Sequence, residues 1–177
     1  MVCYKIGGCR KCIKMAKCII PGTFNPVTLG HCDIIGRCAR IFDEVHVVAF
    51  QNIEKPEWPF TMQERVQLIL KSVAGMPNVV ANCSQRLVSD YAKELGITTL
   101  VKGLRNVRDF EYEADLEWAY KTIDSDLEVL YLRSSPLYMQ LSSSVVREFA
   151  KYQLDLSQLV PAAIINEVTT RLGLDKK

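Results

Sequence analysis

Residues 18–31 read CIIPGTFNPVTLGH, and this stretch decides the fold. Its first three residues form a short apolar strand that ends at a Pro-Gly pair, and its last two, Gly30 and His31, begin a helix. Apolar residues then recur at i, i+4, i+7 and i+8, the spacing of one helical face, at Ile34, Cys38, Ile41 and Phe42. The stretch therefore predicts a strand, a loop and a helix whose first N–H groups favour phosphate.

The same alternation of strand and helix continues to the end of the chain. Further strands are predicted at residues 45–50, 79–81, 99–101 and 129–132. Helices are predicted at 87–95, 109–122, from Ser143 onward and at 161–172. The Thr-Met-Gln-Glu capping box at 61–64 opens another helix, with a buried stripe expected at Val66, Ile69, Leu70 and Val73. This order predicts an α/β fold: a five-stranded parallel sheet with helices on both faces.

Composition excludes several classes of protein. A length of 177 residues suits one domain of about 150 residues, and 49% hydrophobic with 24% charged residues is typical of a globular chain. A net charge of +2 does not suit a general binder of nucleic acid or membrane surfaces. No apolar run reaches the ~20 residues of a membrane span, and the N-terminus lacks a secretory signal. A cytoplasmic protein with no nucleic-acid or membrane partner is expected.

The first residues differ from the rest of the chain. Residues 1–14 contain Cys9 and Cys12 in a CxxC pair and are rich in lysine. They precede Met15, which suits a natural start, so we expect a disordered extension at 1–14 and one domain at 15–177. Zinc would require a second such pair or histidines, and metal binding by this extension stays open as an alternative.

In parallel sheets, ligands bind beyond the carboxyl ends of the strands. That rule selects five loops, at residues 21–31, 51–60, 82–87, 102–109 and 133–144. None contains the GxxxxGK[ST] or GxGxxG pattern of other nucleotide-binding loops. The site chemistry is expected in these loops.

Charged and polar groups gather in two of the loops. Lys102, Arg105 and Arg108 surround Gly103, which indicates an anion cradle. The three serines at 142–144 exceed what one helix cap requires, and Arg147 follows one turn later. No GxSxG pattern accompanies them, which argues against a serine nucleophile.

Other titratable residues allow more than one interpretation. His31, at a helix start, is either a structural residue or a ligand-facing one, and His46 within a strand is interpreted as structural. Asp109, Glu113 and Glu117 share a helix face at four-residue spacing, which is typical of a solvated face unless a ligand or metal meets it.

Four motifs together resemble one enzyme family. They read PGTFNPVTLGH at 21–31, PFTMQER at 59–65, KGLRNVRDFEYE at 102–113 and LSSSVVRE at 141–148. In this order they resemble the bacterial-type phosphopantetheine adenylyltransferases, within the nucleotidyltransferases that carry a T/HxGH signature. The similarity runs from Met15 to Leu172.

The resemblance implies a Rossmann-like nucleotidyltransferase fold and a reaction. AMP would pass from Mg-ATP to 4′-phosphopantetheine by direct in-line attack on the α-phosphate, giving dephospho-coenzyme A and pyrophosphate. Mg²⁺ is the implied cofactor, and family members are usually homohexamers.

The resemblance also implies roles for individual residues. His31 would stabilise the transition state, with Lys55 and Thr23 as further catalytic residues. Acceptor contacts are implied for Thr23, Lys55, Val88 and Lys102. ATP contacts are implied for Thr23, Phe24, His31, Gly103, Leu104, Arg105, Glu113, Tyr138, Met139, Gln140, Leu141, Ser142, Ser143 and Ser144.

Three positions depart from the family pattern. Asn25 stands where aspartate is commoner. Leu29 is the residue between Thr28 and Gly30 within the signature. Lys102 replaces the commoner arginine, and lysine lacks the bidentate fork of arginine. Two other functions stay open. One is an adenylyl or cytidylyl transferase with another acceptor, and the other is a nucleotide-binding regulatory module without catalysis.

Overall fold

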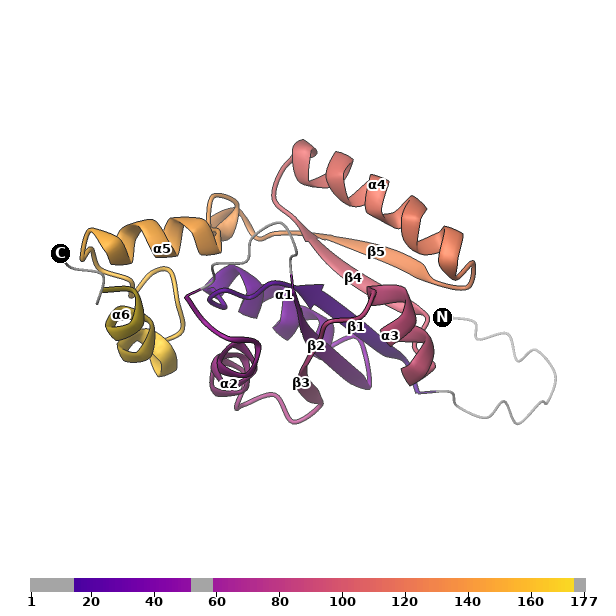
Figure 1. Ribbon diagram of the computed structural model, residues 1–177, viewed down its shortest axis with the longest axis horizontal. Coiled ribbons are helices and arrows are strands. Elements are labelled where there is room, and N and C mark those ends of the chain that lie inside the picture. Colours follow the sequence, from indigo (N-terminus) through magenta and orange to yellow (C-terminus); the bar gives the residue numbers. More distant parts are fainter. Residues whose placement is uncertain (1–14, 52–58, 174–177) are drawn as a thin grey trace, which may run out of the picture.

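The computed structural model describes residues 15–51 and 59–173. Its centre is a parallel sheet of five strands in the order β3-β2-β1-β4-β5 (Figure 1). The strands are β1 (Lys17–Gly22), β2 (Glu44–Phe50), β3 (Val79–Ser84), β4 (Thr99–Leu104) and β5 (Glu128–Arg133). The predicted α/β class and all five strands are confirmed.

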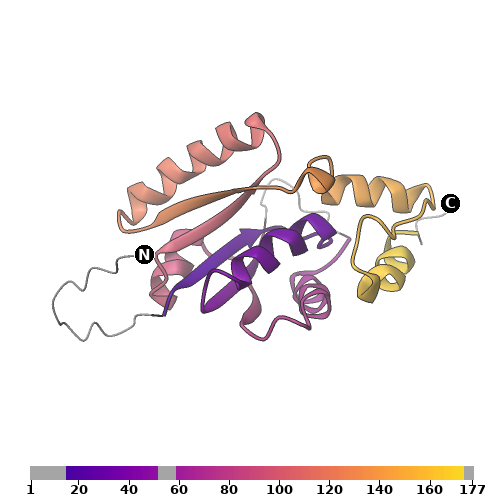
Figure 2. The same ribbon diagram turned by 180° about the vertical axis from the view of Figure 1, so that it is seen from behind.

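Helices cover both faces of this sheet (Figure 2). They are α1 (Leu29–Ala39), α2 (Met62–Ser72), α3 (Val88–Leu95), α4 (Val107–Ile123), α5 (Ser143–Lys151) and α6 (Ile165–Gly173), with short 3₁₀ turns η1 (Pro136–Tyr138) and η2 (Ala162–Ile164). Side chains alternate along β1, so Cys18 and Ile20 join the core beneath α1 and α2, whereas Ile19 joins the core on the other side.

The capping box of α2 forms as predicted, but its buried face differs. Thr61 Oγ1 accepts from the Glu64 N–H, and Glu64 accepts from the Thr61 N–H at 2.7 Å. The buried residues within the helix are Arg65, Leu68 and Ile69, whereas the predicted Leu70 is 39% exposed. Ile69 and Val73 of the predicted stripe are buried and Val66 packs against the core, but the prediction for Leu70 was wrong, and the apolar pattern left out the buried Arg65.

Three predicted boundaries also shift. α1 ends at Ala39, so Ile41 lies beyond the helix and is 63% exposed. β4 continues through Lys102 to Leu104, so part of the predicted fourth loop is strand. The last helix begins at Ile165 rather than Pro161, because a 3₁₀ turn comes first.

The strand order creates a switch point at the centre of the sheet. The chain builds β1, β2 and β3 outward in one direction, then returns to place β4 on the other side of β1. The loops after β1 and β4 therefore separate at their carboxyl ends and leave a crevice there. Gly103 adds to the close packing beside it, since a Cβ there would approach Ile34 Cγ1 to 3.1 Å.

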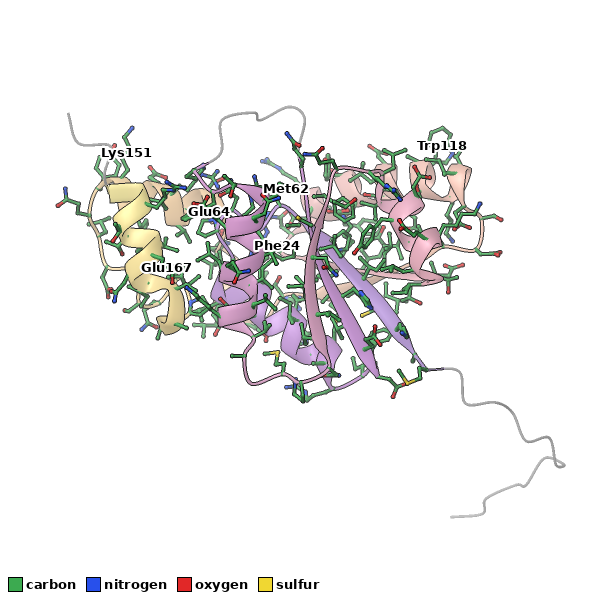
Figure 3. The ribbon with its side chains drawn as sticks, turned by 60° about the horizontal axis from the view of Figure 1, so that its bottom comes forward. Phe24, Met62, Glu64, Trp118, Lys151 and Glu167 are labelled. Atoms are coloured by element: carbon green, nitrogen blue, oxygen red, sulfur yellow. The ribbon has the colours of Figure 1, made fainter. Side chains whose placement is uncertain are left out.

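At the C-terminal end of the chain, α6 packs against α5 and η2. Ion pairs join α6 to α2, from Glu167 to Lys71 and from Arg171 to Glu64, and Figure 3 labels Glu64 and Glu167 on these facing helices. Within the part of the chain that the structure describes, no helix is long and apolar enough to cross a membrane.

Candidate active site

A cavity of about 790 Å³ opens at the carboxyl ends of β1 and β4. Residues from the loops after all five strands line it, as the strand-end rule predicts. The predicted site residues that line it are Thr23, Phe24, His31, Val88, Lys102, Gly103, Arg105, Glu113, Tyr138, Leu141, Ser142, Ser143 and Ser144. One cavity thus brings together residues that the sequence spreads over 122 positions.

His31 is held at the first turn of α1 by a reciprocal cap. Thr28 Oγ1 accepts from the His31 N–H at 3.3 Å, and the Thr28 N–H donates to His31 Nδ1 at 3.0 Å. The Phe24 ring packs edge-on against the imidazole, with centroids 5.0 Å apart. Because Nδ1 accepts a backbone hydrogen bond, the neutral ring carries its proton on Nε2.

The electrostatics of the site keep His31 neutral. Burial, and then the positive charge of Arg105, lower the pKa of His31 to about 4. At neutral pH the ring is therefore an uncharged Nε2–H donor that lines the cavity. A neutral, oriented donor suits charge that develops on a phosphoryl oxygen.

The loop after β1 is tightly held around Phe24. This residue adopts a positive φ of 46°, and a Cβ at position 22 would meet its ring at 3.0 Å, which explains Gly22. From α2, the buried guanidinium of Arg65 donates to the carbonyls of Thr23 at 3.3 Å and Phe60 at 2.9 Å. Figure 3 shows Phe24 near the centre of the molecule, close to α2.

Asn25, which stands where the family more often has aspartate, lies within this loop. Its side chain is fully buried and does not line the cavity, and neither amide atom has a hydrogen-bond partner in the described structure. Its carbonyl accepts from Arg147 Nη1 at 2.6 Å. The main chain at this position therefore connects the loop to α5.

The acidic face of α4 is not the solvated face that the spacing favoured. Asp109 accepts two hydrogen bonds from the Arg105 guanidinium, at 2.8 and 3.0 Å. Glu113 pairs with Lys102 at 2.8 Å, and Glu117 accepts from the Tyr131 hydroxyl at 2.8 Å. Although burial opposes it, hydrogen bonding to Arg105 leaves the pKa of Asp109 below its usual range. The three acids therefore have partners on or just after β4 and on β5: the cations Lys102 and Arg105, and the hydroxyl of Tyr131.

The serine run places hydroxyls at the start of α5. Ser142 caps the helix by accepting from the Val145 N–H, and Ser143 Oγ donates to the Pro26 carbonyl at 2.8 Å. Ser144 Oγ accepts from Arg147 at 3.0 Å. All three serines line the cavity, and Ser142 caps α5 as well.

Some predicted residues are not among those lining the cavity, and others were missed. Leu104, Met139 and Gln140 are absent from the lining that the structure describes, and Lys55 lies outside the described residues. Arg86, Tyr112, Tyr120 and Arg147 line the cavity without having been assigned to it. Arg86 belongs to a loop that the strand-end rule had selected, and Arg147 lies one turn after the serines, so both left a usable signal.

His46 is not among the residues that line the cavity in the described structure. It is buried on β2, and its Nε2 contacts Glu44 Oε1 at 2.5 Å, consistent with the structural interpretation. In the described ranges, no group of three or more histidine, cysteine or acidic residues is placed to hold a metal ion.

Comparison with known proteins agrees with this geometry. The Cytidylyltransferase-like family matches residues 19–149. The phosphopantetheine adenylyltransferase of Staphylococcus carnosus (strain TM300) is 44% identical over 158 residues, 89% of this chain and 98% of its own. That of Finegoldia magna (strain ATCC 29328 / DSM 20472 / WAL 2508) is 43% identical over 157 residues, 89% of this chain and 96% of its own.

A solved structure from Vibrio parahaemolyticus, described as a nicotinate-nucleotide adenylyltransferase, superposes with a TM-score of 0.64 at 18% identity. It covers 86% of this chain and 97% of its own, and at that identity it supports the nucleotidyltransferase fold alone. The family match, the two relatives and the arrangement around His31 agree, and the chain belongs to the phosphopantetheine adenylyltransferase family.

Proposed function

We propose that this chain transfers AMP from Mg-ATP to 4′-phosphopantetheine, giving dephospho-coenzyme A and pyrophosphate. The observation that carries the proposal is the neutral, capped His31 donor in a cavity lined by Lys102, Arg105 and Arg147. A direct attack of one phosphate oxygen on the α-phosphorus needs no protein nucleophile. Positioning and charge neutralisation supply the rate, and this cavity offers both.

The cavity divides naturally between two substrates. The starts of α1 and α5 present backbone N–H groups, the serine hydroxyls and the cations Arg105 and Arg147, a set that suits the triphosphate of ATP. Lys102 and Val88 combine a cation with an apolar surface, which suits a phosphate attached to an uncharged arm. His31 lies in the first turn of α1, directly after the loop that follows the central strand β1, and we place the meeting point of the α-phosphate and the attacking oxygen there.

Mg²⁺ in this proposal arrives with the nucleotide. Glu113 is the acidic residue in the described cavity lining, and it is already paired with Lys102. The described residues also offer no cluster of three ligands. Triphosphate oxygens and water would therefore coordinate the ion, as is usual for Mg²⁺ on ATP, and its charge would offset that of the phosphates.

A homo-oligomer, with a hexamer as the family form, is the proposed assembly in the cytoplasm. Support comes from large apolar side chains outside the cavity lining that α4 leaves exposed: Val107 at 70% and Trp118 at 74%. Figure 3 labels Trp118 on the outer edge of the molecule, at the opposite end from α6. Light scattering coupled to gel filtration would measure the mass of the assembly.

The experiment that tests the function follows pyrophosphate release with paired substrates. ATP and CTP are each offered with 4′-phosphopantetheine, nicotinamide mononucleotide and a polyol phosphate. Pyrophosphate from ATP with 4′-phosphopantetheine alone supports the proposal. Release with another pair assigns a different transferase, and tight ATP binding without release from any acceptor assigns a regulatory module.

A further inference from the structure

A carboxylate lines a cavity that is otherwise built for anions. Glu113 is the acidic residue among the described lining residues, and it lies 2.8 Å from Lys102 Nζ. The two side chains are only 18% and 11% exposed. Arg105 and Arg86 also have carboxylate partners, Asp109 and Glu94, but neither of those acids lines the cavity. Among the described lining residues, Glu113 alone carries a negative charge, and it does so in a cavity that would receive an anionic substrate.

We propose that Glu113 is the resident counter-ion of Lys102 and competes with the acceptor's phosphate for it. The inference rests on the proposed function, since it takes the phosphate at Lys102 to be that of 4′-phosphopantetheine. Glu113 is thus a residue that tunes affinity through Lys102. The family resemblance assigns it to ATP instead, so the two interpretations differ in which substrate responds.

Burial explains why the pair forms. A largely buried ammonium without a counter-ion is strongly destabilising, and the Glu113 carboxylate offsets that penalty. The ion pair involves one oxygen of Glu113. Oε2 of Glu113 is buried, and in the described structure it makes the ion pair without a hydrogen bond of good geometry.

Lys102 keeps a second contact that does not depend on Glu113. Its Nζ lies 5.8 Å from the centre of the Tyr120 ring, close enough for cation–π attraction. Burial, and then the negative charge of Glu113, raise the pKa of Tyr120 to about 12, so its phenol stays neutral. The ammonium is therefore held in place while its anionic partner changes.

Lys102 should exchange the Glu113 carboxylate for the phosphate of the acceptor when both are present. A phosphate dianion carries more charge than a carboxylate and attracts the ammonium more strongly at the same distance. Glu113, displaced by only a few ångströms, still repels the bound phosphate. It therefore weakens binding of the acceptor and of the product, and it can pair with Lys102 again when the product leaves.

The test measures dissociation constants by calorimetry for wild type and Glu113→Gln. The ligands are 4′-phosphopantetheine, pantetheine without the phosphate, and a non-hydrolysable ATP analogue. Glutamine keeps the size and the acceptor oxygen but removes the charge, so 4′-phosphopantetheine should bind about tenfold more tightly. Pantetheine and the ATP analogue should bind as they do to wild type.

Matched variants isolate the contact. Glu117→Gln neutralises a carboxylate one turn along α4 that does not line the cavity, and it should leave all three dissociation constants unchanged. In a Lys102→Met background, Glu113→Gln should tighten 4′-phosphopantetheine binding much less than it does in wild type, because the competition for Lys102 is gone and only direct repulsion of the phosphate remains. Glu113→Asp, which withdraws the carboxylate by one methylene, should bind 4′-phosphopantetheine with intermediate affinity and serves if the glutamine variant does not fold.

Two results would overturn the inference. Unchanged or weaker 4′-phosphopantetheine binding in Glu113→Gln would show that Glu113 does not compete for Lys102. Weaker binding of the ATP analogue alone would return Glu113 to the nucleotide subsite. Pyrophosphate release by wild type is measured separately, so failure of the proposed function is distinguishable from failure of this one.

Discussion

At the scale of the residue, His31 uses the two nitrogens of its ring for different purposes. Nδ1 accepts the Thr28 N–H and completes the cap of α1, which leaves the proton on Nε2 of a residue that lines the cavity. The sequence alone leaves two interpretations of His31, a structural residue and a ligand-facing one. In the structure the same residue completes the cap and lines the cavity, because position N3 of a capping box lies at the helix start, where a ligand can bind.

The lowered pKa of His31 gives a stability prediction with a definite sign. Its folded pKa of about 4 lies below the unfolded value of 6.5, so between these pH values the unfolded chain binds more protons. The contribution of neutral His31 to the free energy of unfolding is fully present above pH 6.5 and is lost as the pH falls toward 4. It amounts to at most about 3 kcal/mol, because the ring is partly open to water.

Denaturant unfolding of wild type and His31→Gln at pH 7 and pH 4.5 measures this contribution. The stability of wild type should fall more steeply than that of the variant. Parallel curves for the two proteins would show that His31 titrates normally in the folded state.

Lys55 is predicted to hold the acceptor, although it lies outside the described residues. Lys55→Ala should raise the KM for 4′-phosphopantetheine much more than the KM for ATP, because a phosphate contact on one substrate is lost. Steady-state kinetics with each substrate varied in turn measures both constants. Equal increases would assign the lysine to neither substrate in particular.

At the scale of the element, α2 fixes the loop that carries the site. Arg65 is buried on this helix and donates to the carbonyls of Thr23 and Phe60, so it ties the loop after β1 to the residues that begin α2. Desolvation lowers the pKa of Arg65, yet a guanidinium stays charged at any physiological pH. The helix therefore acts as a support for Thr23 and Phe24.

Arg65→Met should lose the bonds to both carbonyls and leave them buried. We expect a loss of about 2 kcal/mol in unfolding free energy, or about 4–8 °C in Tm. The KM for ATP should rise as well, because Thr23 is no longer held. Calorimetry and kinetics of the same preparation check both effects, with the exposed Gln63→Met as the control. A stable variant with an unchanged KM for ATP would contradict this support.

The elements themselves were largely predictable from the sequence. Apolar runs and the capping box located every strand and α2, because both signals are local. The errors lie where tertiary contacts override a local pattern. Lys102 and Gly103 look like loop residues, but β4 extends through them because they pair with Tyr131 and Leu132 of β5. Arg65 is buried and binds the Thr23 carbonyl of a distant loop as well as the nearby Phe60 carbonyl, and spacing alone does not show the distant contact.

At the scale of the whole molecule, the strand order places the site. The crevice between β1 and β4 exists only once both have paired with their neighbours, so residues as distant as Gly22 and Arg147 meet there. The strand-end rule selected the contributing loops, because parallel strands all point their carboxyl ends to one edge. It could not show which acids pair with which cations, as with Glu113 and Lys102, since side-chain pairing depends on the packing of α4.

Residues 1–14 stay a prediction, since they lie outside the described residues. Their deletion should leave turnover and Tm unchanged, because the sheet begins at Lys17. Zinc at about one ion per chain, lost in Cys9→Ser and Cys12→Ser together with stability, would instead make this extension a metal site.

The catalytic role of His31 in AMP transfer is the central claim, and His31→Gln tests it most directly. Glutamine is a regular N3 residue of a capping box, so it can accept the Thr28 N–H and preserve α1, but it does not place an imidazole N–H in the cavity. The measurement is kcat for pyrophosphate release, with Tm and the dissociation constant for ATP measured on the same sample. We predict a Tm close to that of wild type, ATP binding within a few-fold, and a kcat lower by about 10²–10³. Wild-type kcat in a correctly folded His31→Gln protein would contradict the account and leave His31 with its structural role alone.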